Sequence, residues 1–338
     1  MDTLLNYSEI ELLEKYVFQS FKKNGIENYM WDDSMKVEVK GDSIITNTDK
    51  VRYDMTGMRL NIMNDFNIGE WLVVSNISDL ISSGGIPKYI MLNLSFPKDF
   101  FLNKFLDILN GISSACLKYN IQIIGGDLST SKEVGLVATA IGELHGIQYV
   151  RRDNSKVGDL LFTEASPGLT STCLYYHYSA KEKGMTLSNN ELKELNSSFT
   201  THDLRIDASK IISNSNYNMS CIDNSDGFGH TLLELSKRNN CGMHIKKEKL
   251  KIHEISHKVA EFLQKKVEEI ICGPGADHKL IGVVSKEDDQ TINKLKSINF
   301  NMIGELESQT DILIDGIPQP KTLLSGWNHF GNWKTKYK

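Results

Sequence analysis

The sequence predicts a protein of two domains, the first of which alternates strands and helices. Its 338 residues are more than one average domain holds, and 40% of them are apolar, which is enough for buried cores. Up to about Gly146, stretches typical of strands alternate with stretches typical of helices, which indicates an α/β or α+β domain. We therefore expect one domain over residues 1–146 and a second over residues 147–338.

The first domain is expected to contain three long helices. An amphipathic pattern over residues 8–23 predicts the first, and residues 65–83 form the second, which stops at a glycine pair. Residues 99–119 repeat apolar side chains with the 3.6 period of a helix. Strands are expected at residues 43–48, 89–96, 121–124 and 134–144.

The second domain gives a similar mixture with one uninformative stretch. Residues 185–218 are polar and rich in Asn and Ser, so they predict little. A turn over residues 156–159 precedes the first strand. Strands are expected at residues 160–163, 220–223, 242–245 and 279–284, and helices at residues 169–182, 227–239 and 255–264.

Composition excludes several classes of protein. The formal net charge of −5 argues against nucleic-acid binding as the main role. Five cysteines without a CxxC pair argue against a disulfide framework or a structural zinc site. The first residues lack the basic start and apolar core of a signal peptide, and no apolar stretch approaches the ~18 residues of a membrane span. We expect a cytoplasmic protein with no membrane partner.

Aspartates recur in loop-like, glycine-rich settings along the whole chain. Several carboxylates in one cleft repel one another and need a cation, and their hard oxygen atoms suit Mg²⁺, which usually arrives with substrate phosphates. This pattern points to nucleotide chemistry. The aspartates are Asp32 and Asp33 in DDS, Asp49 in NTD, Asp79 in SDL, Asp127 in GGD, and Asp223 and Asp226 in DNSDG.

Two of these motifs follow strand-like runs. In GGD, two glycines allow close backbone approach to a ligand, and Asp127 would lie at a strand mouth, although a simple turn with an exposed acid explains the motif equally well. In DNSDG, a strand runs into a helix start whose free N–H groups favour an anion. Ser225 or Asp226 could merely cap that helix. Two aspartates and a serine exceed what one cap needs, which favours a functional turn.

Asp79 is expected in the last turn of a helix, where an acid opposes the helix dipole and a nearby cation would relieve the conflict.

The sequence HEISH at residues 253–257 fits the HExxH pattern of zinc proteases. The residues before it resemble a strand and turn, and nothing selects a third ligand, so zinc is disfavoured. The templates GxxxxGK[ST], GxGxxG and GxSxG are absent from the sequence. ATP would therefore need a different phosphate cradle.

Eight motifs, in order, resemble those of the thiamine-monophosphate kinases. This family is related to aminoimidazole ribonucleotide synthetase, selenophosphate synthetase and the hydrogenase maturation dehydratase. The resemblance covers nearly the whole chain, and the last motif favours the kinases. The motifs are DDS at residues 32–34, NTD at 47–49, NISDLISSGGIP at 76–87, GGDLST at 125–130, RDNSKVGD at 152–159, IDNSDGF at 222–228, GPGADHKL at 273–280 and GWNHF at 326–330.

The resemblance implies an N-terminal α/β domain and a C-terminal α+β domain, in a homodimer whose N-terminal sheets join into a barrel. It implies that ATP lies at the domain junction with several Mg²⁺ ions, and that its γ-phosphoryl group passes directly to thiamine monophosphate. Matched residue by residue, it implies metal ligands at Asp33, Thr48, Asp49, Asp79, Asp127, Asp223 and Asp226, ATP contacts at Gly126, Asp127, Arg152 and Ser225, and acceptor contacts at Asp54, Asp277 and Trp327. A core anchor is the alternative role for Trp327.

The chain departs from the family pattern near the expected acceptor site. Ala276 and Lys279 stand where the family's motif has acids, and Glu164 stands where it has glycine. A related ATP-dependent synthetase or kinase with a different acceptor is therefore the alternative function. A non-catalytic ATP-binding dimer is a further alternative, against which the retained aspartates argue.

Overall fold

The computed structural model describes residues 2–23, 37–41, 43–164 and 166–327. Asp33, one of the expected metal ligands, lies outside these residues. The chain divides into two compact units, which are described separately: Met1–Ile81 with Gly85–His145, and Ser82–Gly84 with Gly146–Lys338.

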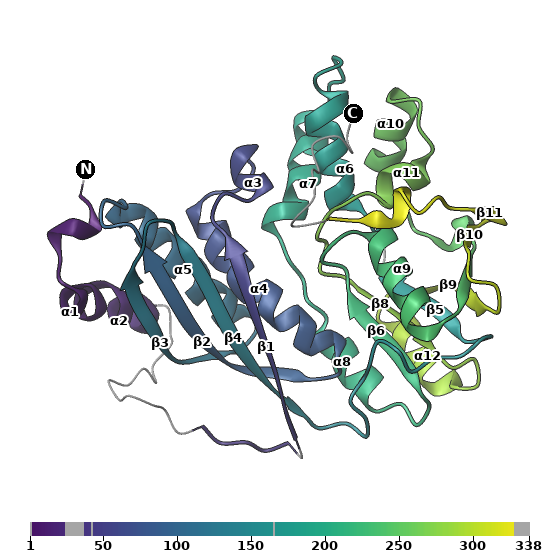
Figure 1. Cartoon of the computed structure of the whole chain (residues 1–338), viewed down its shortest axis with the longest axis horizontal. Coiled ribbons are helices and arrows are strands. Elements are labelled where there is room, and N and C mark those ends of the chain that lie inside the picture. Colours follow the sequence, from purple (N-terminus) through teal and green to yellow (C-terminus); the bar gives the residue numbers. More distant parts are fainter. Residues whose placement is uncertain (1, 24–36, 42, 165, 328–338) are drawn as a thin grey trace. The chain divides into compact units, whose positions relative to one another are not determined.

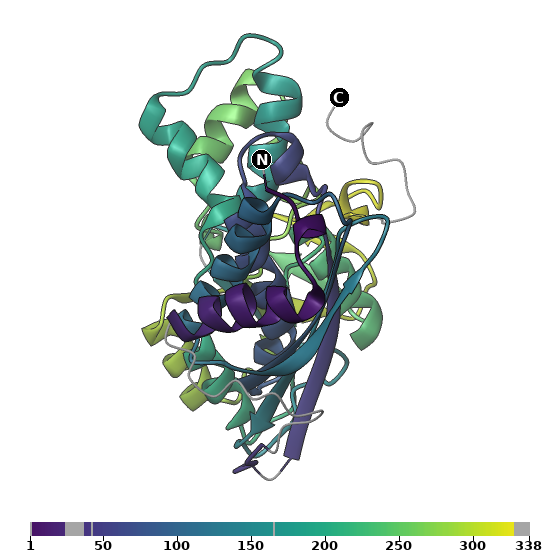
Figure 2. The same ribbon diagram turned by 90° about the vertical axis from the view of Figure 1, so that its left-hand side faces the viewer.

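The first unit is a four-stranded sheet with helices on one side (Figures 1 and 2). The predicted helix over residues 8–23 is present, interrupted by a π-helical turn, and begins at a capping box formed by Ser8 and Glu11. The elements are η1 (Leu4–Asn6), α1 (Glu9–Leu12), η2 (Leu13–Val17), α2 (Phe18–Lys23), β1 (Ser43–Arg52), α3 (Thr56–Arg59), α4 (Asp65–Ser82), β2 (Ile86–Phe96), α5 (Leu102–Lys118), β3 (Gln122–Thr130) and β4 (Gly135–Leu144).

The two faces of this sheet differ in what covers them. The strand order is β1-β4-β2-β3, with β2 and β3 parallel and the other pairs antiparallel. Side chains such as Leu92 and Ala138 are buried on the face that the helices cover. Alternate residues point the other way, and among them Ile44 is 53% and Met91 39% exposed. Among the described residues, the second face is therefore covered only in part, where the segment over residues 37–41 contacts Tyr89 and Glu143.

Helices α4 and α5 pack against each other through glycines. A Cβ atom at Gly69 would lie 2.1 Å from the carbonyl oxygen of Ile108, and one at Gly111 would lie 1.9 Å from that of Phe66. The two backbones can approach this closely only because both positions lack a side chain. The contact fixes α4, which carries Asp79, relative to α5.

Two strands run further than the sequence predicts. β1 continues three residues past Asp49, so this acid lies within a strand rather than at its end. β3 continues through GGD to Thr130, because Gly125 and Gly126 adopt φ of 133° and 154° and form a bulge that keeps the pairing with β2. The expectation of a strand mouth at Asp127 is wrong.

The second unit contains a seven-stranded sheet in the order β11-β10-β7-β9-β5-β8-β6. Its pairs are antiparallel except β10 with β7. The elements are β5 (Leu160–Glu164), α6 (Leu169–Tyr175), η3 (Tyr176–Ala180), α7 (Asn189–Thr200), α8 (Ile206–Ser213), β6 (Met219–Asp223), α9 (Phe228–Asn239), β7 (Gly242–Ile245), η4 (Lys247–Lys249), α10 (Glu254–Phe262), α11 (Val267–Ile271), β8 (Leu280–Val284), α12 (Asp289–Ser297), β9 (Phe300–Glu307), β10 (Ile312–Ile314), β11 (Ile317–Pro318) and η5 (Leu323–Ser325).

The polar stretch over residues 185–218 is ordered into two helices, α7 and α8. Helix α7 starts at a capping box of Ser188 and Glu191 and buries Leu195 and Phe199.

All five cysteines are free and buried. Within the described residues, we find no helix with the length and apolar character needed to cross a membrane.

Candidate functional site

In the first unit, two of the predicted metal ligands are held side by side by an asparagine. The side-chain amide of Asn47 donates to Asp49 Oδ2 at 3.0 Å and to Asp79 Oδ2 at 2.8 Å. The backbone N–H of Asp49 donates to Asn76 Oδ1 at 3.0 Å. Strand β1 and the end of helix α4 thus bring together two carboxylates that are 30 residues apart in the chain.

Thr48 and Asp127 lie on the second face of the same sheet. Thr48 Oγ1 is 2.8 Å from Thr139 Oγ1 on β4. Asp127 on β3 is the cross-strand partner of Asn93 on β2. On its other side, Asn93 is the partner of Val137 on β4. Partners across a sheet point to the same side, and Asn93 and Asp127 are both exposed. Within this unit the structure does not bring Asp127 next to Asp49.

The donor set of the Asp49–Asp79 pair suits a hard cation. Carboxylate and amide oxygens are the ligands that Mg²⁺ accepts in proteins. Over the described part of the chain, no three His, Cys, Asp or Glu side chains gather in one cluster. The pair therefore fits part of a metal shell, whose other oxygens would come from phosphates, water or further acids.

In the second unit, the DNSDG turn joins the end of β6 to the start of α9. Asp223 is buried, Ser225 is exposed and Asp226 is partly exposed. The turn is held from inside by Asn224, whose Oδ1 accepts the N–H of Gly227 at 3.0 Å and the hydroxyl of Thr231 at 3.3 Å. Since Asn224 performs the internal capping, the side chain of Ser225 is left on the surface.

Asp277 fixes the loop between α11 and β8. Its carboxylate accepts the N–H groups of Gly168 at 2.6 Å and Thr170 at 2.9 Å, at the start of α6. It also accepts the amide of Asn224 at 3.1 Å. These contacts give the carboxylate a structural task. The predicted contact of Asp277 with an acceptor remains a prediction.

The residues on either side of this loop form a polar corner. His278 Nδ1 lies 3.5 Å from Asp223 Oδ2, and Lys279 Nζ donates to the carbonyl of Ser166 at 3.0 Å. Glu164 Oε1 accepts the N–H of Leu280 at 3.0 Å. Burial of Glu164 raises its pKa to about 7. Two of the departures from the family pattern, Glu164 and Lys279, are thus neighbours.

The remaining predicted residues are placed as follows. Arg152 is exposed, and its carbonyl accepts the side-chain amide of Asn239 on α9. The N–H of Trp327 donates to the carbonyl of Asp226 at 2.9 Å, so the GWNHF motif begins against the DNSDG turn. In the first unit, Asp54 forms a two-point contact with Arg52 at 3.1 Å. Gly126 packs against β2, where a Cβ would lie 1.9 Å from the carbonyl oxygen of Leu92.

The structure does not support a zinc site at HEISH. His253 is the N-cap of α10, and its Nδ1 accepts the N–H of Ile255 while its Nε2 lies 2.9 Å from Glu194 Oε1. Both ring nitrogens are therefore engaged, and His253 precedes the helix on which HExxH would have to lie.

The sequence interpretation missed the asparagines that hold the acids. Asn47 and Asn224 stand within two residues of aspartates, in NTD and DNSDG. Asn76 precedes Asp79 by three residues, close to one helical turn. An amide near a clustered carboxylate was the available signal, because its N–H₂ group can join acids that would otherwise repel each other.

Comparison with known proteins shows which family model and which solved structures this chain resembles. Residues 31–144 match the model of the AIR synthase related protein, N-terminal domain. The structure is similar to thiamine-monophosphate kinase from Stenotrophomonas maltophilia K279a, with a TM-score of 0.74, 17% identity and coverage of 92% of this chain and 98% of that one. It is similar to hydrogenase maturation protein HypE in complex with ATP, with a TM-score of 0.72, 16% identity and coverage of 93% and 94%. The fold is therefore the mixed α/β, two-sheet fold of AIR synthase-like proteins.

Among proteins with this fold, the sequence is similar to thiamine-monophosphate kinases. The chain is 26% identical over 326 residues to thiamine-monophosphate kinase of Aquifex aeolicus (strain VF5), covering 95% of this chain and 99% of that relative. It is 25% identical over 289 residues to the Bacillus subtilis (strain 168) enzyme of the same name, covering 80% and 84%. A structure described as AaThiL complexed with AMPPCP and TMP matches with a TM-score of 0.70, 24% identity and coverage of 96% and 99%. The predicted resemblance to thiamine-monophosphate kinases is confirmed.

Asn224→Ala is expected to destabilise the second unit by about 2–4 kcal/mol. The substitution removes three hydrogen bonds and leaves the buried N–H of Gly227 without its acceptor. Urea unfolding monitored by circular dichroism measures the change. Ser225→Ala, at the exposed neighbouring position, is the control and should change stability by less than about 0.5 kcal/mol. Equal stability of the two variants would contradict the role given to Asn224.

Glu164 is expected to make stability fall as pH rises towards 8. Its folded-state pKa of about 7 lies above the ordinary value of 4.5, so folding favours the protonated form. The stability it contributes is fully present below 4.5 and is lost as pH rises through 7, with a slope of at most about 1.4 kcal/mol per pH unit. Glu164→Gln keeps an acceptor for the N–H of Leu280 but cannot ionise. Its unfolding midpoint should vary less than that of the unmodified protein between pH 5 and 8, and parallel curves would refute the assignment.

Proposed function

We propose that the protein transfers the γ-phosphoryl group of ATP to the phosphate of thiamine monophosphate, giving thiamine diphosphate and ADP. The similarity over 95% of the chain to a thiamine-monophosphate kinase supports this reaction, as does a related structure complexed with AMPPCP and TMP. The observation on this chain that carries the proposal is the pair of carboxylates, Asp49 and Asp79, that Asn47 holds together.

The reaction joins two phosphate groups, so its main obstacle is the repulsion between negative charges. When bound, Mg²⁺ supplies the positive charge that offsets this repulsion. Asp49 and Asp79 would hold it in the first unit. We assign the remaining ligand positions to Asp33, Thr48, Asp127, Asp223 and Asp226.

The other residues position the two substrates. Ser225 and Arg152 offer an exposed hydroxyl and a guanidinium to the nucleotide phosphates, with the backbone at Gly126 and Asp127 as further ATP contacts. Trp327, next to Asp226, would stack on the acceptor ring, and Asp54 would contact the acceptor. We propose that Asp277 contributes to acceptor binding by fixing its loop through Gly168 and Asn224. No side chain is required as a covalent nucleophile, so catalysis rests on positioning and charge.

The reaction is tested by incubating the purified protein with ATP, Mg²⁺ and thiamine monophosphate and analysing products by mass spectrometry. We expect equal amounts of thiamine diphosphate and ADP. Asp49→Asn should lower the rate about 100-fold or more, because it removes charge where phosphate charge must be offset. Asp107→Asn, at an exposed position of α5, is the matched control and should leave the rate unchanged.

The products also separate the alternatives. Inorganic phosphate in place of thiamine diphosphate would contradict the kinase and favour a synthetase that activates its substrate and then loses phosphate. ADP formed only with some other acceptor would retain the ATP site and reject thiamine monophosphate.

We further propose that two copies of the chain associate through the second face of the four-stranded sheet, as the family resemblance implies. Ile44 and Met91 expose apolar surface on this face, and Val137 and Ile141 on β4 are only partly covered. A sheet normally buries its apolar face, and a second sheet is a suitable cover. Joining two such sheets would give the expected barrel.

Met91→Lys is expected to convert the dimer into a monomer, since it places an unpaired charge in a buried contact. Size-exclusion chromatography with light scattering measures the mass. Ile147→Lys is the control, because Ile147 is 67% exposed and lies in the second unit. A dimer that survives Met91→Lys but is broken by Ile147→Lys would place the interface elsewhere.

A further inference from the structure

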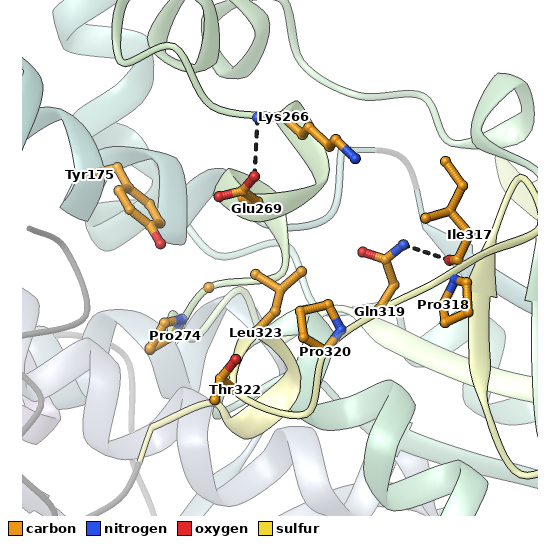
Figure 3. A pocket seen from close by; sticks show the side chains of 11 residues that line it. Tyr175, Lys266, Glu269, Pro274, Ile317, Pro318, Gln319, Pro320, Thr322 and Leu323 are labelled. Carbon is orange, nitrogen blue, oxygen red and sulfur yellow. Dashed lines mark hydrogen bonds between the residues drawn. The ribbon is translucent and has the colours of Figure 1, made fainter.

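A pocket in the second unit has no role in the chemistry described above. It has a volume of about 450 Å³ and lies between helices α6 and α11 and the segment from β11 to η5. Figure 3 shows Tyr175 and Pro274 at the left of it, Leu323 and Pro320 in the centre, and Pro318 and Gln319 at the right. The volume is in the range of about 300–1,000 Å³ that small-molecule sites occupy.

The walls of the pocket combine apolar and polar side chains, with prolines prominent among the apolar ones. Three of the six prolines in the chain line it: Pro274, Pro318 and Pro320. Proline fixes its own backbone and carries no N–H group, so these walls need little ordering when a ligand binds. The aromatic ring of Tyr175 and the compact apolar rings of the prolines can pack against a planar ring. The lining therefore favours a ligand with an aromatic or heteroaromatic part.

The charges at the rim favour an anionic group on that ligand. The negative charge of Glu269 is partly balanced by two groups. The backbone N–H of Lys266 lies 3.4 Å from its Oε1, and Lys265 Nζ lies 3.8 Å from its Oε2. The exposed ammonium of Lys266 takes part in no ion pair within the described part of the chain. Gln319 adds an amide on the opposite wall, where its Nε2 donates to the carbonyl of Ile317 (Figure 3). Lys266 is thus the available partner for a phosphate or carboxylate.

The pocket shares its walls with the loops of the candidate site. Gly273, beside Pro274, packs against the start of α9, where a Cβ at Gly227 would lie 2.4 Å from the carbonyl oxygen of Gly273. Leu323 opens η5, which contacts α9 and leads to Trp327. A ligand in the pocket would press on segments that continue into the DNSDG turn and the GWNHF motif, and this provides a route for coupling between the two sites.

We propose that this pocket is a second ligand site that takes a heteroaromatic phosphate and regulates the reaction. The proposal rests on the proposed function, since thiamine diphosphate, the product, belongs to this chemical class. Occupancy by product would then lower turnover without competing directly with the acceptor. Lys266 would bind the phosphate, and Tyr175 and the prolines would enclose the ring.

Calorimetric titration of the whole protein with thiamine diphosphate tests the proposal, with diphosphate and thiamine as probes that each lack one half of the ligand. We expect two sites per chain. Lys266→Ala should weaken one of them about tenfold, the effect of losing one charge-assisted hydrogen bond. Gln319→Trp, which fills the cavity, should abolish the same site. Lys286→Ala, at another exposed lysine, is the control.

Kinetics distinguishes this site from the acceptor site. Both pocket variants should keep kcat and the KM for thiamine monophosphate while losing non-competitive inhibition by thiamine diphosphate. A single binding event per chain, an isotherm unchanged by both variants, or a rise in KM matching the loss of product binding would overturn the proposal. Absence of thiamine diphosphate formation by the unmodified protein would instead reject the proposed function, whatever the titration showed.

Discussion

The organisation of the second unit depends on one partly buried polar junction, the contact between Asn224 and Asp277. Through it the end of β6, the start of α9, the start of α6 and the loop before β8 are tied together, although up to 109 residues separate the groups that bond. Buried polar groups are stable only when their hydrogen bonds are satisfied, so a shifted register would leave several of them unpaired. This junction therefore specifies where Asp223, Ser225 and Asp226 lie more sharply than apolar packing alone could.

An amide has a similar task in the first unit, with a different electrostatic result. Asn47 donates to both Asp49 and Asp79 and itself brings no charge to the pair. A lysine at this position would neutralise the pair and compete with a cation. An amide holds the two carboxylates together without adding a positive charge of its own. The same residue type thus fixes a turn at Asn224 and a pair of acids at Asn47.

Much of the fold could be predicted from local patterns, and the misses have physical causes. The strand over residues 242–245 and the helix ending near Asp79 were predicted because period and stop signals agree there. The continuation of β3 past GGD was missed because glycines signal a turn, whereas here they form a bulge that the neighbouring β2 stabilises. Helix α7 was missed because its polar surface masks Leu195 and Phe199, although Ser188 and Glu191 form a recognisable capping pair.

The residue types of the candidate site could be predicted from the sequence, but the side of the sheet to which each residue points could not. A sequence states that Thr48, Asp49 and Asp127 are present, but the side of the sheet that each faces follows from strand register, which depends on tertiary pairing. One consequence is that Asp49 lies beneath the helices, while Thr48 and Asp127 lie on the second face.

The departures at Glu164 and Lys279 are better understood together than singly. Lys279 replaces an acid of the family pattern at the start of β8, and Glu164 introduces an acid at the end of β5. These strands are paired antiparallel, and Glu164 accepts the N–H of Leu280, so the two departures meet in one corner. The corner thus holds one acid and one lysine, and the lysine ammonium donates to the carbonyl of Ser166 rather than to the acid. The two departures therefore belong to one local arrangement of polar groups, whose effect on the acceptor is best judged from both residues together.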